Sequence, residues 1–279
     1  MRLQRSLLGL ETPVKDAPDL DRRGKIAIAL SLTSVGGFVD AVGYIALFQI
    51  FTANMSGNSV HIGMYLGQRD WPNLLRPLCA VAAYFVGVVL TRITIQIAGR
   101  RGIRRIASVT LGVEALLLVF FARATPAMHL GQIVGQHSSA YFALVALLAF
   151  SMGVQTGTLT HVGTLTIYTT FVTGALIKLT EAFTRVLFWA YDTLPQRGMS
   201  GIAGLAAQQK DVREGTMLAS TWTCYVLGAA LGTISKQRWE LRALYVPVAA
   251  LVAIIVVDQF RPVDLEEEQH QTGSGTRKG

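Results

Sequence analysis

The sequence has few charged residues. Only 15% of its 279 residues are charged, against roughly 25% in an average soluble protein. Between Ile26 and Gln68 the one formally charged side chain is Asp40. The net charge of +8 does not indicate nucleic-acid binding, because the basic residues gather at the ends of apolar runs. Lysines and arginines take such positions at a cytoplasmic membrane face. The composition therefore argues against a soluble domain and favours a membrane protein.

Cysteine is scarce as well. Cys79 and Cys224 lie in or beside apolar segments without metal-ligand spacing, so we interpret both as small buried thiols and expect no metal and no cofactor. Residues 1–25 lack the apolar region of a cleavable signal peptide. We expect them to form a cytoplasmic N-terminal segment, followed by an uncleaved membrane anchor. The polar, glycine-rich tail at 261–279 is typical of disorder.

Long apolar runs account for most of the chain. About 20 apolar residues cross about 30 Å of hydrocarbon, and lipid offers backbone amides no partner, so these runs must be helices. The sequence predicts an all-α, polytopic helical membrane bundle with six to eight membrane segments in the bacterial cytoplasmic membrane, with the lipid bilayer as its partner. The apolar runs are 26–48, 52–67, 78–99, 106–122, 140–159, 166–188, 217–235 and 243–260.

Two stretches of sequence recur in the same order. YFVGVVL at 84–90 resembles YVLGAAL at 225–231, and TANMSGN at 52–58 resembles TTFVTGA at 169–175. The second pair aligns Ser56 with Thr173 and Gly57 with Gly174. Upstream, GGFVDAV faces MGVQTGT, with Asp40 opposite Gln155 when the alignment is gapped. We predict an internal duplication with a first repeat at 26–122, a loop at 123–139, and a second repeat at 140–260 that carries a polar insertion at 190–216.

The arginine cluster RRGIRR at 100–105 bears on the orientation. If every segment crosses and the N terminus is cytoplasmic, this cluster lies outside, against the positive-inside tendency. If 52–67 and 166–188 instead enter and leave on one side, six segments cross and the cluster lies inside. Each half then has three crossings, and the halves are inverted. We favour this inverted arrangement with re-entrant motif helices over a parallel bundle of four plus four.

Asp40 and the polar stretch FTANMSGN at 51–58 are the first candidate site. Asp40 lies fifteen residues after Lys25, about 22 Å along a helix, where a charge costs about 2.5 to 3.5 kcal/mol. It either bonds to a neighbouring helix or binds a cation or proton, and we favour binding. Small and polar residues in broken helices expose backbone groups to substrates in transporters; helix packing is the alternative. The predicted substrate-binding residues are Asp40, Asn54, Ser56, Gly57, Asn58, Gln155, Thr173 and Gly174.

A second group of residues is a candidate proton or ion path: His61, Glu114, Lys178 and Glu181. Lys178, Glu181 and Arg185 share a helix face, which is usually an internally paired surface. Glu114 is a deep acid for which Arg92 or Lys178 would be a partner, and His61 fits a structural role better than a proton relay.

Pairs of glycines at four-residue spacing predict close helix packing. They are Gly63–Gly67, Gly153–Gly157 and Gly228–Gly232.

The motifs also carry a family resemblance. GGFVDAVGYIALFQIFTANMSGN, followed by MGVQTGT and a later TTFVTG, resembles the YoaK-like family of bacterial transmembrane proteins over residues 26 to 260. That family shows a glycine-to-aspartate helix, an Asn-Met-Ser/Thr-Gly-Asn signature and a Gly-x-Gln segment. This chain departs from it at 156–157, where Thr-Gly replaces the usual Asn-Ala. The resemblance implies a membrane protein and supplies no substrate.

A transporter of a small solute or ion, coupled to protons or cations through Asp40, is the function that the sequence favours. A membrane scaffold or regulator without flux is the alternative. An intramembrane serine protease is disfavoured because His61 points away from Ser56 on a helix. An aspartyl protease is disfavoured because Gln155 takes the position paired with Asp40. We therefore expect no enzyme activity and no nucleic-acid partner, and the sequence leaves a homo-oligomer open.

Overall fold

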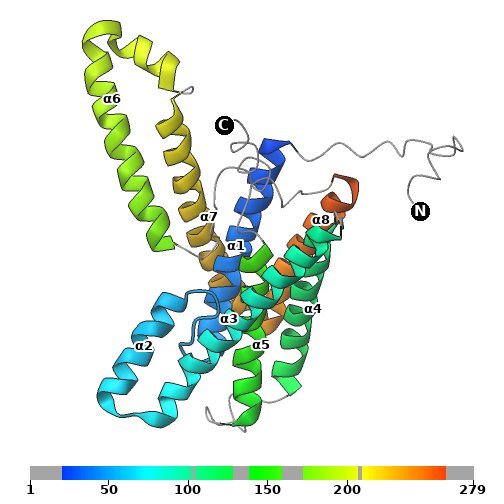
Figure 1. The fold of residues 1–279 in the computed structure, drawn as a ribbon. Helices are drawn as coiled ribbons and strands as arrows, with labels where there is room; N and C mark the ends of the chain where they lie inside the picture. Colours follow the sequence, from blue (N-terminus) through cyan, green and yellow to red (C-terminus); the bar gives the residue numbers. More distant parts are fainter. Residues whose placement is uncertain are drawn as a thin grey trace, which may run out of the picture.

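The computed structural model describes residues 21–101, 103, 105–127, 138–158, 172–206 and 209–261. In this part of the chain every regular element is a helix, as predicted (Figure 1). Most of the predicted N-terminal segment, of the loop at 123–139 and of the C-terminal tail lies outside the described residues, as does the motif stretch at 169–171. The elements are α1 (Arg22–Ala46), α2 (Met55–Gln68), α3 (Trp71–Arg100), α4 (Ile106–Ala127), α5 (Ser139–Thr158), α6 (Val172–Ala206), α7 (Lys210–Trp239), the 3-10 helix η2 (Glu240–Leu244) and α8 (Tyr245–Phe260).

Each predicted apolar segment corresponds to one of these α-helices, with large differences at the boundaries of α3, α6 and α7. α7 begins at Lys210 rather than at 217. α3 begins at Trp71 rather than at 78, because the Asp70 carboxylate caps its first turn and Pro72 suits that turn. α6 continues to Ala206 past a break at Gly198, whose φ is 66°. The stretch at 190–216, predicted as a polar insertion, is therefore largely helical and joins α6 to α7.

Five helical stretches of the described chain are long and apolar enough to cross a membrane. α2 has 14 residues and is about 21 Å long, shorter than about 30 Å of hydrocarbon. α6 is absent from the five. The chain is thus a helical membrane protein. The stretches are Arg23–Ala46, Trp71–Arg100, Ile106–Ala124, Ser139–Thr158 and Lys210–Phe260, the last containing α7, η2 and α8.

Helices α1 and α7 pack closely through glycines. A Cβ atom on Gly228 would lie 2.1 Å from the carbonyl oxygen of Ser34, and one on Gly232 would lie 2.6 Å from that of Phe38. The second contact is four residues further along both helices, so α1 and α7 run parallel (Figure 1). From the other side, a Cβ on Gly37 would lie 2.2 Å from a carbonyl oxygen of α7.

Helices α3 and α5 form a second glycine-packed parallel pair. A Cβ on Gly87 would lie 3.2 Å from the Cα of Gly153, and four residues further along both helices Gly157 meets Thr91. A Cβ on Gly153 would lie 2.3 Å from the carbonyl oxygen of Tyr84. The predicted packing faces at 153–157 and 228–232 are confirmed.

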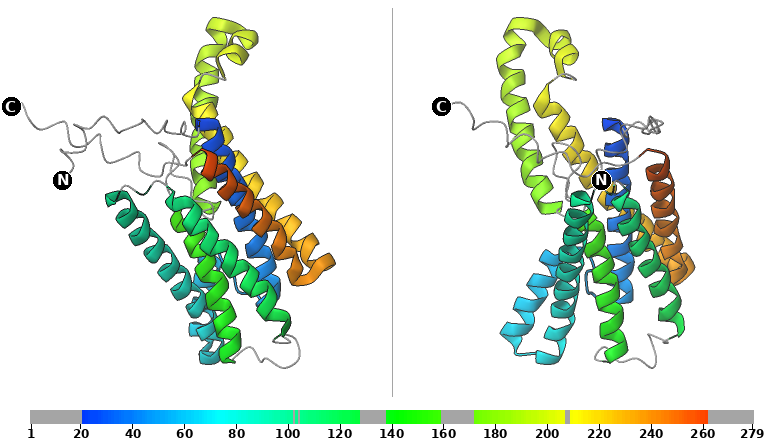
Figure 2. Two further views of the ribbon diagram at one scale, coloured as in Figure 1. Left: turned by 90° about the vertical axis from the view of Figure 1, so that its right-hand side faces the viewer. Right: turned by 45° about the vertical axis from the view of Figure 1, so that its right-hand side comes forward.

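The third predicted glycine face is wrong. Nothing in the described chain lies within 4 Å of a Cβ built on Gly63 or Gly67. α2 packs against α3 alone among the described elements, and α6 packs against α7 alone. Figures 1 and 2 show the α2–α3 and α6–α7 hairpins extending from opposite ends of the bundle. The glycines of α2 therefore face away from the other helices.

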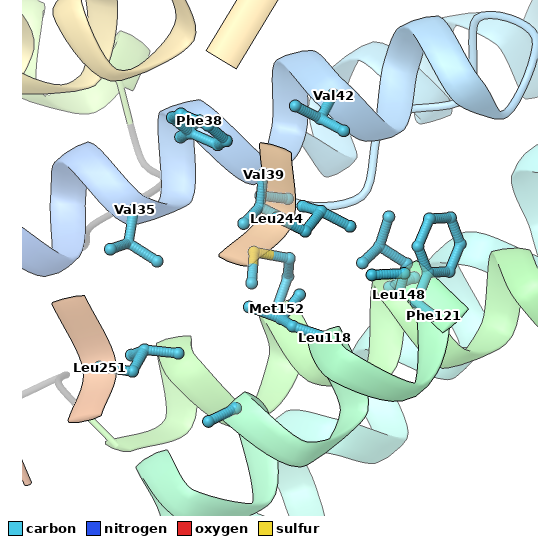
Figure 3. Close-up of a cluster of buried hydrophobic side chains, with 14 of the residues drawn as sticks. Val35, Phe38, Val39, Val42, Leu118, Phe121, Leu148, Met152, Leu244 and Leu251 are labelled. Carbon is cyan, nitrogen blue, oxygen red and sulfur yellow. The ribbon is translucent and has the colours of Figure 1, made fainter. Parts of the chain in front are cut away.

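The hydrophobic core lies between α1, α4, α5, η2 and α8. Figure 3 shows Val39 of α1, Leu118 of α4, Met152 of α5 and Leu244 of η2 meeting there. α1 and α5 run antiparallel, because the hydroxyl of Tyr141 reaches the carbonyl of Leu47 at one end and Gln155 reaches the carbonyl of Leu32 at the other. The core thus joins helices from both halves of the chain.

Candidate functional site

Asp40 holds the loop between α1 and α2. Its Oδ1 accepts hydrogen bonds from the backbone N–H of Thr52 at 2.7 Å and of Ala53 at 2.8 Å, and from the Thr52 hydroxyl at 3.3 Å. Its Oδ2 accepts one at 2.7 Å from the hydroxyl of Tyr225 in α7. Asp40 is 3% exposed, and both of its oxygens are bonded to protein donors. In this structure the carboxylate therefore joins α1, the loop and α7.

Two asparagines of the polar motif also fix this loop. Asn58 is fully buried; its Oδ1 accepts from the backbone N–H of Phe51 at 3.1 Å, and its Nδ2 donates to the Phe51 carbonyl at 2.7 Å. Asn54 caps α2, accepting from the backbone N–H of Gly57 at 3.3 Å and from the Ser56 hydroxyl at 2.7 Å. The side chains of Asn54, Ser56 and Asn58 thus bond within their own segment, and Asp40 reaches the motif through Thr52 and Ala53.

The end of α1 is held by an arginine that the sequence reading passed over. Arg76 of α3 is 5% exposed and donates to the Phe48 carbonyl and, at 3.2 Å, to the hydroxyl of Tyr141. Tyr141 in turn donates to the Leu47 carbonyl at 2.8 Å. A cation at the C-terminal end of a helix is favoured by the helix dipole. Phe48 and Gln49 have φ values of 51° and 68°, a region in which non-glycine residues carry strain.

A hollow lies against this strained turn. It has a volume of about 530 Å³ and combines aromatic rings with an amide and a guanidinium. Pockets of this size that combine aromatic walls with a few polar groups are typical of small-molecule sites. The hollow is lined by Tyr44, Ile45, Phe48, Gln49, Tyr65 and Arg76.

His61 lies beside the rings of Phe51 and Tyr65, and Tyr65 also lines the hollow. Its ring is 6.3 Å from the rings of Phe51 and Tyr65, and its Nδ1 has no hydrogen-bond partner among the described residues. Gly57 packs under Phe51, whose ring would lie 2.7 Å from a Cβ at that position. The motif helix α2 therefore presses its first turns against the loop.

The other candidate residues lie apart from this site. Gln155 of α5 donates from Nε2 to the carbonyl of Leu32 in α1 at 2.5 Å. Glu114 is fully buried in α4, and neither carboxyl oxygen has a hydrogen-bond partner among the described residues. The expected hydrogen bond from Arg92 or Lys178 to Glu114 is therefore not formed.

The charged residues of α6 lie on an exposed surface. Arg185 contacts Glu181 at 4.0 Å, Asp211 at 2.6 Å and Glu214 at 3.4 Å, and the hydrogen bond to Asp211 raises the pKa of the Arg185 guanidinium. Lys178 is also exposed. These contacts fit the internally paired surface that their spacing indicates and fasten α6 to α7.

Thr173 and Gly174 lie in the first turn of α6, and Gly174 is buried. The side chain of Thr173 lies outside the described part. Within that part no group of three or more His, Cys, Asp or Glu side chains is placed to hold a metal ion.

The two glycine-packed helix pairs carry matching tyrosine contacts. The hydroxyl of Tyr225 donates to Asp40, and the hydroxyl of Tyr84 lies 3.0 Å from the hydroxyl of Thr156. Tyr84 and Tyr225 open the two recurring stretches YFVGVVL and YVLGAAL. The recurrence of these stretches was the signal that could have pointed to Tyr225 as a partner of Asp40.

Comparisons with known proteins agree with a membrane protein. The family described as "Protein of unknown function (DUF1275)" matches residues 28–257. The chain is 25% identical, over 245 residues, to the UPF0700 transmembrane protein YoaK of Bacillus subtilis (strain 168), covering 86% of this chain and 95% of that protein. No solved structure matches.

Proposed function

Because the chain belongs to the DUF1275 family of unknown function, we propose from its own geometry that it is a transporter of a small solute or ion. In this proposal the solute binds in the hollow beside the α1–α2 loop, and the loop is the part that moves. The hollow combines aromatic walls with Gln49 and Arg76, and two strained residues form the turn next to it. A strained, clamped loop at a pocket suits a two-state element.

The observation that carries the proposal is the pair of matched helix crossings. Gly228 meets α1 as Gly87 meets α5, and the hydroxyls of Tyr225 and Tyr84 reach the same two helices. This correspondence supports an internal duplication in which α1, α3 and α4 are the counterparts of α5, α7 and α8. When α1 is aligned with α5 without a gap, the counterpart of Asp40 is Thr156. Gln155, which the gapped alignment places opposite Asp40, is the neighbour of Thr156.

The direction of the helices supports inversion of the two halves. α1 and α5 are counterparts in this duplication and run antiparallel. The start of α1, the end of α3, the start of α4 and the end of α8 lie at one end of the bundle (Figure 2). With the arginine cluster at 100–105 placed in the cytoplasm, α1, α3, α4, α5, α7 and α8 make six crossings. Inverted halves with broken helices are a common transporter architecture.

The hydrogen bonds that attach the loop to Asp40 provide a means of coupling transport to a proton or cation. Asp40 binds the backbone N–H groups of Thr52 and Ala53 by charge-assisted hydrogen bonds, which are roughly twice as strong as neutral ones. A proton on Asp40, or a cation that draws it away, weakens these bonds and frees the loop beside the hollow. The full set of protein donors on Asp40 equally suits a fixed structural bond, which is the specific support for a scaffold without flux.

Flux measured in proteoliposomes separates the two functions. The purified chain is assayed for uptake of radiolabelled amino acids, sugars, nucleobases and inorganic ions, with and without proton and sodium gradients. Asp40→Asn keeps an oxygen for Thr52 and Ala53 and an amide opposite Tyr225, so we expect a folded protein. Its flux should fall at least tenfold and lose its dependence on the gradient. Ser56→Ala, which removes one exposed hydroxyl of the motif, is measured beside it.

The melting temperature of each variant is the matched control. A folded Asp40→Asn protein with unchanged flux would remove Asp40 from the mechanism. Absence of flux for every solute class in the wild type, together with a large loss of stability in Asp40→Asn, would favour the scaffold. Glu240→Gln removes an exposed charge that is not part of the loop and should change neither quantity.

A further inference from the structure

Two buried polar side chains in the interior of the bundle have hydrogen-bond acceptors without donors. Glu114 of α4 and Gln155 of α5 are both 0% exposed. Both carboxyl oxygens of Glu114 and Oε1 of Gln155 are without a hydrogen-bond partner in the described part of the chain. The Nε2 of Gln155 is already used by the Leu32 carbonyl at 2.5 Å. Buried polar atoms are nearly always paired in folded proteins, so these atoms require an explanation.

The packing of α4 on α5 brings the two side chains to the same level of the core. Figures 1 and 2 show α4 and α5 running in opposite directions, and Figure 3 shows Leu118 of α4 beside Met152 of α5 in the buried core. Glu114 lies one helical turn before Leu118 on the same face of α4, and Gln155 lies one turn after Met152 on the same face of α5. Because the helices are antiparallel, these two steps lead to the same layer of the core.

Two acceptors that face each other need a hydrogen atom between them. An ionised carboxylate and an amide oxygen only accept, whereas a protonated carboxyl group donates one O–H. Glu114 lies nine residues after Arg105, about 13 Å along α4, at a depth where an unpaired charge is strongly disfavoured. We infer that Glu114 and Gln155 form a buried proton-binding site in which the protonated carboxyl of Glu114 donates to Oε1 of Gln155.

The titratable groups on the neighbouring helices have other positions or partners. α5 carries no acid, lysine, arginine or histidine, and its Tyr141 bonds to Leu47 at the far end of the helix. On α8, Asp258 accepts from Ser108 near the start of α4. Tyr245 accepts from Arg123 at the other end, at 2.5 Å.

The remaining neighbours of α4 in the described chain are η2 and α3. Glu240 and Arg242 of η2 are exposed, as is Arg100 of α3, and Arg92 has an interaction of its own. Asp40 on α1 is taken up by the loop and Tyr225. No described group therefore donates to Glu114 in place of a proton.

Infrared difference spectroscopy of the full chain in lipid tests the site without any flux measurement, so the result does not depend on the proposed transport. At neutral pH the wild type should show the C=O stretching band of a protonated carboxyl group. The band should disappear in Glu114→Gln and persist in the control Glu240→Gln. In Gln155→Leu it should move to higher frequency, because the O–H then loses its acceptor.

The melting temperature supplies a second readout that does not require the band to be resolved. Glu114→Gln places an amide N–H where the proton would be, so its melting temperature at neutral pH should equal or exceed that of the wild type. At alkaline pH the wild type should lose stability more steeply than this variant. A wild type without the band overturns the proposal, as does a band that survives in Glu114→Gln. A melting temperature that rises with sodium or potassium in the wild type alone also overturns it, since Glu114 would then be ionised and hold a cation.

Discussion

The α1–α7 and α3–α5 crossings are built alike but give their tyrosines different partners. Each brings a tyrosine and a glycine of one helix against a glycine-bearing helix that runs parallel to it. The Tyr225 hydroxyl finds the carboxylate of Asp40, whereas the Tyr84 hydroxyl finds the hydroxyl of Thr156. The same packing therefore supports an ionisable group in one half and a neutral group in the other.

The difference separates what holds the bundle together from what is special to the first half. Close backbone contact at the glycines is common to both crossings and needs no charge. Asp40 adds a second task, because it also binds two backbone N–H groups of the α1–α2 loop. A deep charge retained beside a neutral counterpart is better explained by that loop than by helix packing.

The largest effect is expected where both crossings are alike. Gly228→Ala places a Cβ 2.1 Å from a carbonyl oxygen of the facing helix, and Gly153→Ala places one at 2.3 Å. A backbone carbonyl cannot rotate away as a side chain can. Overpacking of this kind costs about 1 to 3 kcal/mol and sometimes more. We expect both variants to lose most of their folded yield by size-exclusion chromatography and to melt well below the wild type.

The exposed glycine Gly63 is the matched control for these two substitutions. Nothing lies within 4 Å of its Cβ position, and alanine is a better helix former than glycine by about 1 kcal/mol. Gly63→Ala should therefore be neutral or stabilising. If only one of the two crossings tolerates alanine, their likeness is superficial and the proposed duplication loses its main support.

The second effect concerns the side chain that each tyrosine hydroxyl contacts. Asp40→Ala removes the acceptor of two backbone N–H groups and two hydroxyls, and a buried group left unsatisfied costs about 1 to 3 kcal/mol. Thr156→Ala removes one neutral side-chain contact with Tyr84 and should cost about 1 kcal/mol. Thermal melts of the two variants in detergent measure the difference. Equal losses would mean that Asp40 does no more for stability than its neutral counterpart.

Much of the fold follows from short-range features of the sequence. Apolar runs located every α-helix of the described chain, because only helices satisfy the backbone in lipid. The depth of Asp40 marked it as bonded or functional, and two of three glycine pairs marked real crossings. The length of α6 was missed because its second half is polar and contains glycines, which resembles a loop.

The site was harder to predict, for a physical reason. Two of the four donors that bind Asp40 are backbone N–H groups of the loop, and every residue other than proline carries such a group. Arg76 was missed because it lies before the predicted start of its helix, where an arginine reads as a surface cation. The proposed juxtaposition of Glu114 and Gln155 depends on the register of two antiparallel helices, which no local pattern fixes.

The smallest effect is expected from removing the two tyrosine hydroxyls, and it is the sharpest test of the comparison. Phenylalanine keeps the ring and its packing in both crossings, so only the hydrogen bond changes. Tyr225→Phe deletes a hydrogen bond to a charged acceptor, worth about 1.5 to 3 kcal/mol, and Tyr84→Phe deletes one between neutral groups, worth about 0.5 to 1.5 kcal/mol. Tyr225→Phe should therefore lower the melting temperature more than Tyr84→Phe does. In an Asp40→Asn background the charge is gone, and the effect of Tyr225→Phe should shrink to that of Tyr84→Phe. If the effect of Tyr225→Phe is instead unchanged in that background, the tyrosine acts through packing, and the charge of Asp40 serves the loop alone.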